Sequence, residues 1–140
     1  MNHSDDQVII EGVLDALLEV LEKDALSIHP HDRVIDDLGL DSLDLLSLVF
    51  QLEIKFGIKI SLREMEKQAQ KELGGIPLEE EGIFSEEGLL KLRAAMPEVP
   101  AAEFKSGLST SELPRLFRVQ TFVNLVKHAQ NRSGQQETAD

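Results

Sequence analysis

The stretch Asp36-Asp37-Leu38-Gly39-Leu40-Asp41-Ser42-Leu43-Asp44 decides how this chain folds. It places Ser42 between the carboxylates of Asp41 and Asp44, at the point where a loop turns into a strongly apolar helix. A hydroxyl on the first turn of a helix faces outward and sits in the positive field of the helix N-terminus, which suits a covalently attached phosphate. The stretch therefore indicates a serine that is modified rather than one that is catalytic.

The helix predicted over residues 42–56 is apolar on two sides. One stripe, with spacings of three and four, is expected to face the core and consists of Leu45, Leu48, Val49, Leu52 and Phe56. A second stripe with the same spacings consists of Leu43, Leu46 and Phe50. Such a helix is either fully buried or keeps one face for a partner, and a small core rarely encloses a whole helix. The second stripe is therefore predicted to bind a partner.

Most of the remaining chain also has helical periodicity. Further helices are predicted over residues 8–21, 61–73, 86–95 and 119–129. Asp5 or Asp6 is placed to cap the first of these helices and Ser85 to cap the third. No strand is predicted, so the expected fold class is all-α.

The composition restricts the function further. The 140 residues contain no cysteine, which excludes disulfides, thiolate metal sites and cysteine nucleophiles. The formal net charge is −12, and residues 1–60 hold 13 acids against 4 bases. Such a surface repels nucleic acid and anionic lipid and attracts proteins with Lys and Arg patches, although it also serves solubility alone. Since there is neither a signal peptide nor an apolar run that could span a bilayer, a cytoplasmic protein without membrane insertion is expected.

The stretch from Asp36 to Asp44, the helix after it and the segment Phe56-Gly57-Ile58-Lys59-Ile60 together resemble acyl carrier proteins. The segment that begins Arg118-Val119-Gln120-Thr121-Phe122-Val123 is similar to the last helix of that family. The resemblance implies a four-helix bundle in which Ser42 carries a 4′-phosphopantetheine arm taken from coenzyme A. The arm would hold acyl groups as thioesters for fatty-acid, lipid or polyketide-type biosynthesis. The protein itself would be a monomeric carrier and not an enzyme.

The resemblance also implies which partners bind and where. They would be a phosphopantetheinyl transferase and acyl-transferring and synthase enzymes with basic docking patches. The acidic contacts would come from Asp41, Asp44 and Glu53, and the apolar ones from Leu43, Leu46 and Phe50. The core stripe of the second helix would line the cleft for the acyl chain. Compared with typical fatty-acid carriers, this helix has fewer carboxylates, with Ser47, Gln51, Ile54 and Lys55 at or near the usual acidic positions.

The domain organisation departs from an ordinary carrier. Residues 1–130 are predicted to form one acyl-carrier-like domain, followed by a flexible polar tail at residues 131–140. An insertion at about residues 74–116 separates the second helix from the last. It is expected to be partly helical and to pack against the bundle, because it has too many apolar residues for a plain linker: Ile83, Phe84, Leu89, Leu90, Leu92, Phe104 and Leu108.

Four other interpretations compete with the carrier. Ser42 would be a simple N-cap if its hydroxyl bonded the helix, although Asp41 can cap equally well and leave that hydroxyl free.

His29 and His31 are assigned to a solvated loop, and no metal site is predicted. The order Gly39-Leu40-Asp41-Ser42-Leu43 is superficially similar to the Gly-Asp-Ser-Leu esterases, but an inserted leucine and the absence of a preceding strand argue against a hydrolase. The last alternative is a helical protein-docking module that never receives the arm.

Overall fold

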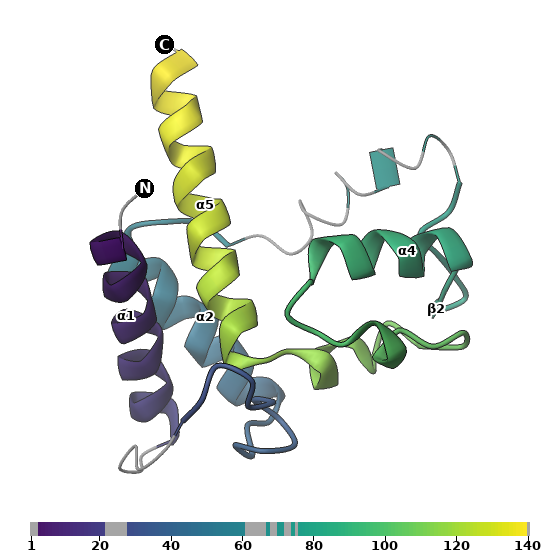
Figure 1. Ribbon diagram of the computed structural model, residues 1–140, viewed down its shortest axis with the longest axis horizontal. Coiled ribbons are helices and arrows are strands. Elements are labelled where there is room, and N and C mark those ends of the chain that lie inside the picture. Colours follow the sequence, from purple (N-terminus) through teal and green to yellow (C-terminus); the bar gives the residue numbers. More distant parts are fainter. Residues whose placement is uncertain are drawn as a thin grey trace. The chain divides into compact units, whose positions relative to one another are not determined.

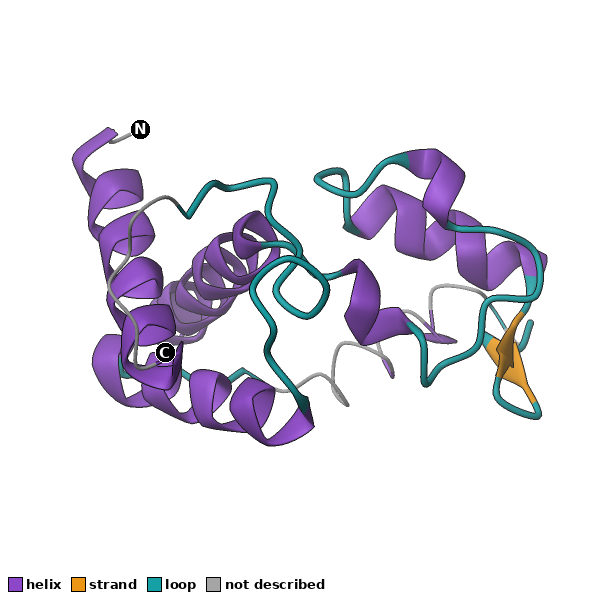
Figure 2. Ribbon diagram, turned by 90° about the horizontal axis from the view of Figure 1, so that it is seen from below, coloured by secondary structure: helices purple, strands orange, loops and turns teal. Residues whose placement is uncertain are grey.

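The computed structural model describes residues 3–21, 28–60, 67, 70, 71, 74 and 76–139, and it places side chains for those between 6 and 131. Contacts divide the chain into two compact units, Met1–Ile60 with Arg118–Asp140 and Ser61–Phe117. The second unit therefore begins earlier than the insertion that we placed at residues 74–116. Helices dominate the described residues (Figure 2), which confirms the predicted all-α class.

The first unit contains the helices α1 (His3–Leu21), α2 (Ser42–Phe56) and α5 (Val119–Ala139). Helix α1 packs against both α2 and α5 (Figure 1). The most deeply buried side chains come from all three helices and the loop before α2: Val13, Leu17, Val34, Leu48, Leu52, Phe122 and Val126. The core stripe predicted for α2 is confirmed at Leu48 and Leu52, while Leu45, Val49 and Phe56 are half-buried.

Two glycines fix the position of α2. A Cβ atom at Gly12 would overlap the ring of Phe56, so the missing side chain allows α1 and α2 to approach closely. Gly57 ends α2 in the left-handed conformation, with a φ of 63°, and its N–H donates to the carbonyl oxygen of Glu53.

The loop before Ser42 is attached to the start of α5. Arg33 and Arg118 form an isolated antiparallel bridge. The Val119 N–H donates to the carbonyl oxygen of Asp32 over 3.0 Å. Val34 and Leu40 bury their side chains in the core, and Gly39 turns the chain with a φ of 82°. These contacts hold the chain on both sides of the turn that leads into Ser42.

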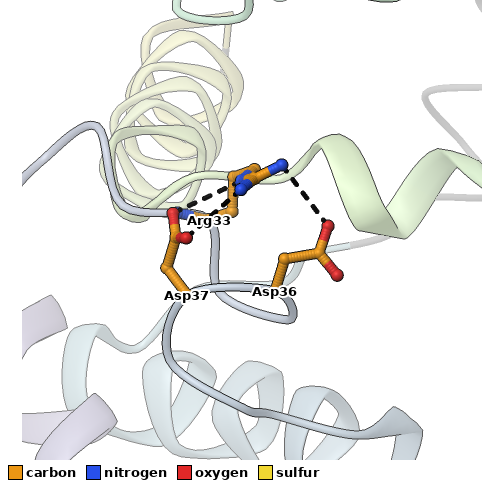
Figure 3. A network of polar contacts seen from close by, with 3 residues as sticks. All are labelled: Arg33, Asp36 and Asp37. Atoms are coloured by element: carbon orange, nitrogen blue, oxygen red, sulfur yellow. Dashed lines mark hydrogen bonds and ion pairs between the residues drawn. The ribbon is translucent and has the colours of Figure 1, made fainter.

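Arg33 also organises the acidic part of this loop (Figure 3). Its Nε and Nη2 atoms each lie 3.3 Å from a carboxylate oxygen of Asp37, and its Nη1 atom lies 3.6 Å from Asp36 Oδ2. The backbone N–H of Arg33 donates to Asp37 Oδ2 over 2.8 Å. That backbone bond, assisted by the guanidinium, holds the pKa of Asp37 below its ordinary value. The two aspartates thus bind an arginine of their own chain.

The second unit contains a short hairpin and the helix α4 (Glu86–Ala95). Strands β1 (Glu79–Glu80) and β2 (Ile83–Phe84) pair antiparallel across Glu81 and Gly82, whose φ values of 53° and 81° are those of a type I′ turn. Ser85 caps α4 as predicted, because its Oγ accepts from the Gly88 N–H over 2.9 Å. The unit has a core of its own, formed by Leu78, Phe84, Leu89, Met96, Val99, Phe104, Leu116 and Phe117.

Two short 3₁₀ helices, Ala101–Glu103 and Leu113–Leu116, lie between α4 and α5. The turn before the second of them is closed by Glu112. Its Oε1 atom accepts from the backbone N–H and the hydroxyl of Ser109, over 3.0 and 2.9 Å, and these bonds lower the pKa of the carboxyl.

Several predicted boundaries were wrong. No strand was expected, and the hairpin was missed because strands of two residues are too short to show an alternating pattern. Helix α1 begins at His3, so neither Asp5 nor Asp6 is its N-cap. Helix α5 begins at Val119 as predicted but continues to Ala139 instead of ending at Ala129. The flexibility assigned to residues 131–140 stays a prediction, and the helix predicted over residues 61–73 lies outside the described residues except for positions 67, 70 and 71.

The two stripes of α2 predict losses of stability that differ in size. Leu52→Ala removes a fully buried side chain and should lower the free energy of unfolding by about 2 to 5 kcal/mol. Leu43→Ala makes the same chemical change at an exposed position of the same helix and should cost less than about 0.5 kcal/mol. Urea unfolding followed by circular dichroism measures both values. Equal losses would mean that the two stripes do not differ in burial.

The lowered pKa of Asp37 predicts a pH-dependent contribution to stability. A group with a depressed folded-state pKa stabilises the protein above its unfolded-state pKa, and this contribution is lost as the pH falls through the folded-state value. Asp37→Asn should therefore be less stable than the wild type at pH 7, and the difference should shrink below about pH 4. Denaturation midpoints at several pH values test this expectation. Glu19→Gln, which removes an exposed carboxylate of α1, controls for the loss of one negative charge; a difference for Asp37→Asn that is independent of pH would contradict it.

Candidate functional site

Ser42 is the first residue of α2, and it is exposed. Asp41 is the N-cap: its Oδ1 atom accepts from the Asp44 N–H over 2.9 Å, and Asp44 Oδ2 accepts in return from the Asp41 N–H over 3.1 Å. This reciprocal pair is a capping box. The Ser42 hydroxyl forms no hydrogen bond with the residues that the structure describes. The interpretation of Ser42 as a simple N-cap is therefore wrong.

The start of α2 has a field that favours an anion. The first N–H groups of a helix have no partner within the helix, and they lie at the positive end of its dipole. The capping box provides a hydrogen-bond acceptor for the N–H of Asp44 but none for the N–H groups of Ser42 and Leu43. A phosphate bonded to the Ser42 oxygen would lie beside these donors.

The outward face of α2 is apolar. Leu43, Leu46 and Phe50, which we predicted to bind a partner, are all exposed. Ile54 continues their row one turn further and is exposed as well. Sequence analysis noted Ile54 only as a residue near the usual acidic positions, although its spacing of four from Phe50 could have placed it on this face.

Glu53 has a structural role that sequence analysis did not predict. Its Oε2 atom accepts from the backbone N–H of Ile60 over 2.9 Å, and its carbonyl oxygen accepts from the N–H of Ile58 over 3.1 Å. Glu53 therefore closes the turn after α2. The residue is half-buried, and its predicted role as an acidic partner contact stays a prediction.

The histidines whose side chains the structure describes lie apart from one another in the loop and on α5. His29 Nδ1 lies 3.8 Å from Asp32 Oδ2, while His31 and His128 are exposed. Within the described ranges, no group of three or more histidine, aspartate or glutamate side chains could hold a metal ion. The backbone between Val34 and Asp41 is a loop, so Ser42 does not follow a strand as the nucleophile of an esterase does.

A small apolar hollow lies in the first unit between α1, the loop and α5. It is lined by Ile10, Leu14, Ile28, Pro30, Val119, Gln120 and Val123. The α2 residues that we expected to line an acyl cleft do not contribute to it, so that assignment stays a prediction. In the described part of the chain, no helix is both long and apolar enough to cross a membrane.

Comparison with known proteins agrees with this geometry. Residues 11–71 match the family model described as a phosphopantetheine attachment site. The acyl carrier protein AcpXL of Brucella melitensis is 38% identical over 93 residues, which are 66% of this chain and 92% of that protein. AcpXL of Rhizobium etli is 37% identical over 93 residues, 66% of this chain and 94% of that protein. The acyl carrier protein of Solidesulfovibrio magneticus is 40% identical over 53 residues, 38% of this chain and 68% of that protein.

No solved structure matches this chain. The matched segment includes all of α2 and the loop that leads into Ser42, and the AcpXL proteins are covered over more than nine-tenths of their length. The chain therefore belongs to the acyl carrier protein family, whose cofactor is 4′-phosphopantetheine.

Proposed function

We propose that Ser42 is the attachment site of the arm and that the protein carries acyl groups on it as thioesters. In the loading reaction, the Ser42 oxygen would attack the phosphate next to the pantetheine of coenzyme A. A phosphodiester forms, the pyrophosphate bond breaks, adenosine 3′,5′-bisphosphate leaves, and a base of the transferase takes the hydroxyl proton. Because the chain contains no cysteine, the thiol that holds the acyl group comes entirely from the arm.

One observation carries this proposal. A serine at the start of a helix commonly caps it, and a capping hydroxyl accepts a hydrogen bond from the helix. In this chain Asp41 has that task, so the hydroxyl of Ser42 is exposed and unbonded among the described residues. The residues present therefore fit a group that must reach Ser42 from solvent.

The neighbours of Ser42 support partner binding. We propose that the transferase and acyl-transferring or synthase enzymes contact Leu43, Leu46 and Phe50, with Asp41, Asp44 and Glu53 at the edge of the contact. Exposed large apolar side chains in a row are typical of an interface. The proposed role is that of a carrier in the cytoplasm, where it presents its cargo to enzymes and catalyses no reaction itself.

The proposed pathway is fatty-acid, lipid or polyketide-type biosynthesis. The relatives in Brucella and Rhizobium are named acyl carrier protein AcpXL and not simply acyl carrier protein. The outward face of α2 carries few carboxylates. This supports the proposal that the partner enzymes differ from those that serve ordinary fatty-acid carriers. The alternative, a docking module that never receives the arm, would use the same apolar face without Ser42.

Loading by a transferase separates the two functions. After incubation with coenzyme A and a broad-specificity phosphopantetheinyl transferase, the intact mass should increase by one arm. Ser42→Ala should gain nothing, because the only proposed acceptor oxygen is absent. Ser47→Ala, on the next turn of the same helix, is the matched control and should load like the wild type. The carrier proposal fails if the wild type gains no mass or if Ser42→Ala gains as much.

A further inference from the structure

The first turn of α2, which bears Ser42, has no fully buried side chain to hold it. Asp41, Ser42 and Leu43 are exposed, and Leu45 is half-buried. The first buried residue of α2 is Leu48, more than one helical turn after Ser42. Helix ends with few buried contacts open more readily than helix middles. The position of the Ser42 oxygen therefore depends on the capping box and on the loop that leads into it.

That loop is attached to the N-terminus of α5. The first N–H groups of a helix have no partner within the helix. In α5, the Val119 N–H donates to the carbonyl oxygen of Asp32 over 3.0 Å. The next N–H, that of Gln120, donates to the carbonyl oxygen of Pro30 over 3.0 Å. Since Val119 is itself buried, residues 30–32 are supported by the start of a helix that packs in the core.

Asp37 connects this support to the turn before the serine (Figure 3). Its Oδ2 atom accepts from the backbone N–H of Arg33 over 2.8 Å, and the guanidinium of Arg33 donates to both carboxylate oxygens over 3.3 Å. The carbonyl oxygen of Arg33 accepts in return from the N–H groups of Asp37 and Leu38, over 3.0 and 3.1 Å. Arg33 also forms the antiparallel bridge with Arg118, directly before α5. One carboxylate thus closes the turn onto a residue whose backbone is paired with the start of α5.

The turn continues without interruption to the N-cap of α2. The Leu40 N–H donates to the carbonyl oxygen of Val34 over 3.0 Å, and both residues are buried. Asp41 follows directly and forms the capping box with Asp44. A displaced turn would move the Asp41 backbone, open the capping box and release the Ser42 oxygen from its place. A nucleophile that is misplaced by about 1 Å can react about 100-fold more slowly.

We infer that Asp37 is a positioning residue for Ser42. Through Arg33, it ties the turn before the serine to the start of α5, and it thereby keeps the first turn of α2 formed when the transferase acts. The inference rests on the proposed function of Ser42. It gives an exposed acid of the loop a role in presenting the serine that does not require contact with a partner enzyme.

The test measures loading of the full chain by a phosphopantetheinyl transferase with coenzyme A. Initial rates from intact mass over a range of carrier concentrations give kcat and KM. Asp37→Ala should lower kcat about tenfold, because the turn loses its bonds to Arg33 while Val34 and Leu40 still anchor the loop. KM should stay within about threefold, because the exposed apolar side chains of α2 are unchanged.

Amide hydrogen exchange distinguishes a local opening from a general loss of stability. In Asp37→Ala, exchange at residues 38–44 should become faster, while exchange in the middle of α1 and of α5 stays as in the wild type. Glu112→Ala is the matched control, because the Glu112 carboxylate closes a turn of the second unit by accepting from the backbone N–H and the hydroxyl of Ser109. It should leave kcat, KM and exchange at residues 38–44 unchanged.

A conservative variant keeps the test decisive if Asp37→Ala does not fold. Asp37→Asn retains an oxygen that can accept from the Arg33 N–H but weakens the bonds to the guanidinium, so its kcat should fall about threefold. A kcat equal to that of the wild type in the folded variants, or a loss of kcat without faster exchange at residues 38–44, would overturn the inference. An equal loss of kcat in Glu112→Ala would do the same. If the wild type gains no arm at all, it is the proposed function that fails.

Discussion

The capping box between Asp41 and Asp44 is the interaction on which the site depends. It fixes where α2 begins, and it satisfies the helix N-terminus with two carboxylates instead of a hydroxyl. Ser42 therefore starts the helix with an exposed side chain that forms no hydrogen bond to any residue the structure describes. If the sequence of α2 were shifted by one residue at a fixed helix position, every side chain would rotate by about 100°. Leu48 and Leu52 would then turn out of the core.

The loop before the capping box depends on contacts that are distant in sequence. Arg33 holds Asp36 and Asp37, and the backbone at Asp32 and Arg33 pairs with the start of α5, some 85 positions later. Acids near a carrier serine are readily interpreted as partner contacts. Here they stabilise the turn that leads to the serine, because both pair with an arginine of the same chain.

Sequence reasoning was reliable where a single helix decides the outcome. The spacing of three and four distinguished the buried Leu48 and Leu52 from the exposed Leu43, Leu46 and Phe50. The spacing of Asp41 and Asp44 predicted that Asp41, and not the Ser42 hydroxyl, caps the helix. It was less reliable where the outcome depends on tertiary contacts. Nothing in the local sequence pattern indicates that the Glu53 carboxylate accepts a hydrogen bond from Ile60. Nor does it indicate that Arg33 forms ion pairs with both Asp36 and Asp37. The hairpin at Glu79–Phe84 depends on a glutamate with positive φ, which propensity disfavours.

The charge of the protein and its proposed docking face act at different stages of binding. A net charge of −12 produces a long-range field that increases the rate at which a cationic partner arrives. It does not determine how long the complex lasts, which depends on the contacts buried once the partner is seated. The contacts that we propose for the partner enzymes are the exposed apolar side chains of α2, Leu43, Leu46 and Phe50. Under this proposal, an acidic carrier attracts many proteins by its charge and retains those that cover these apolar side chains.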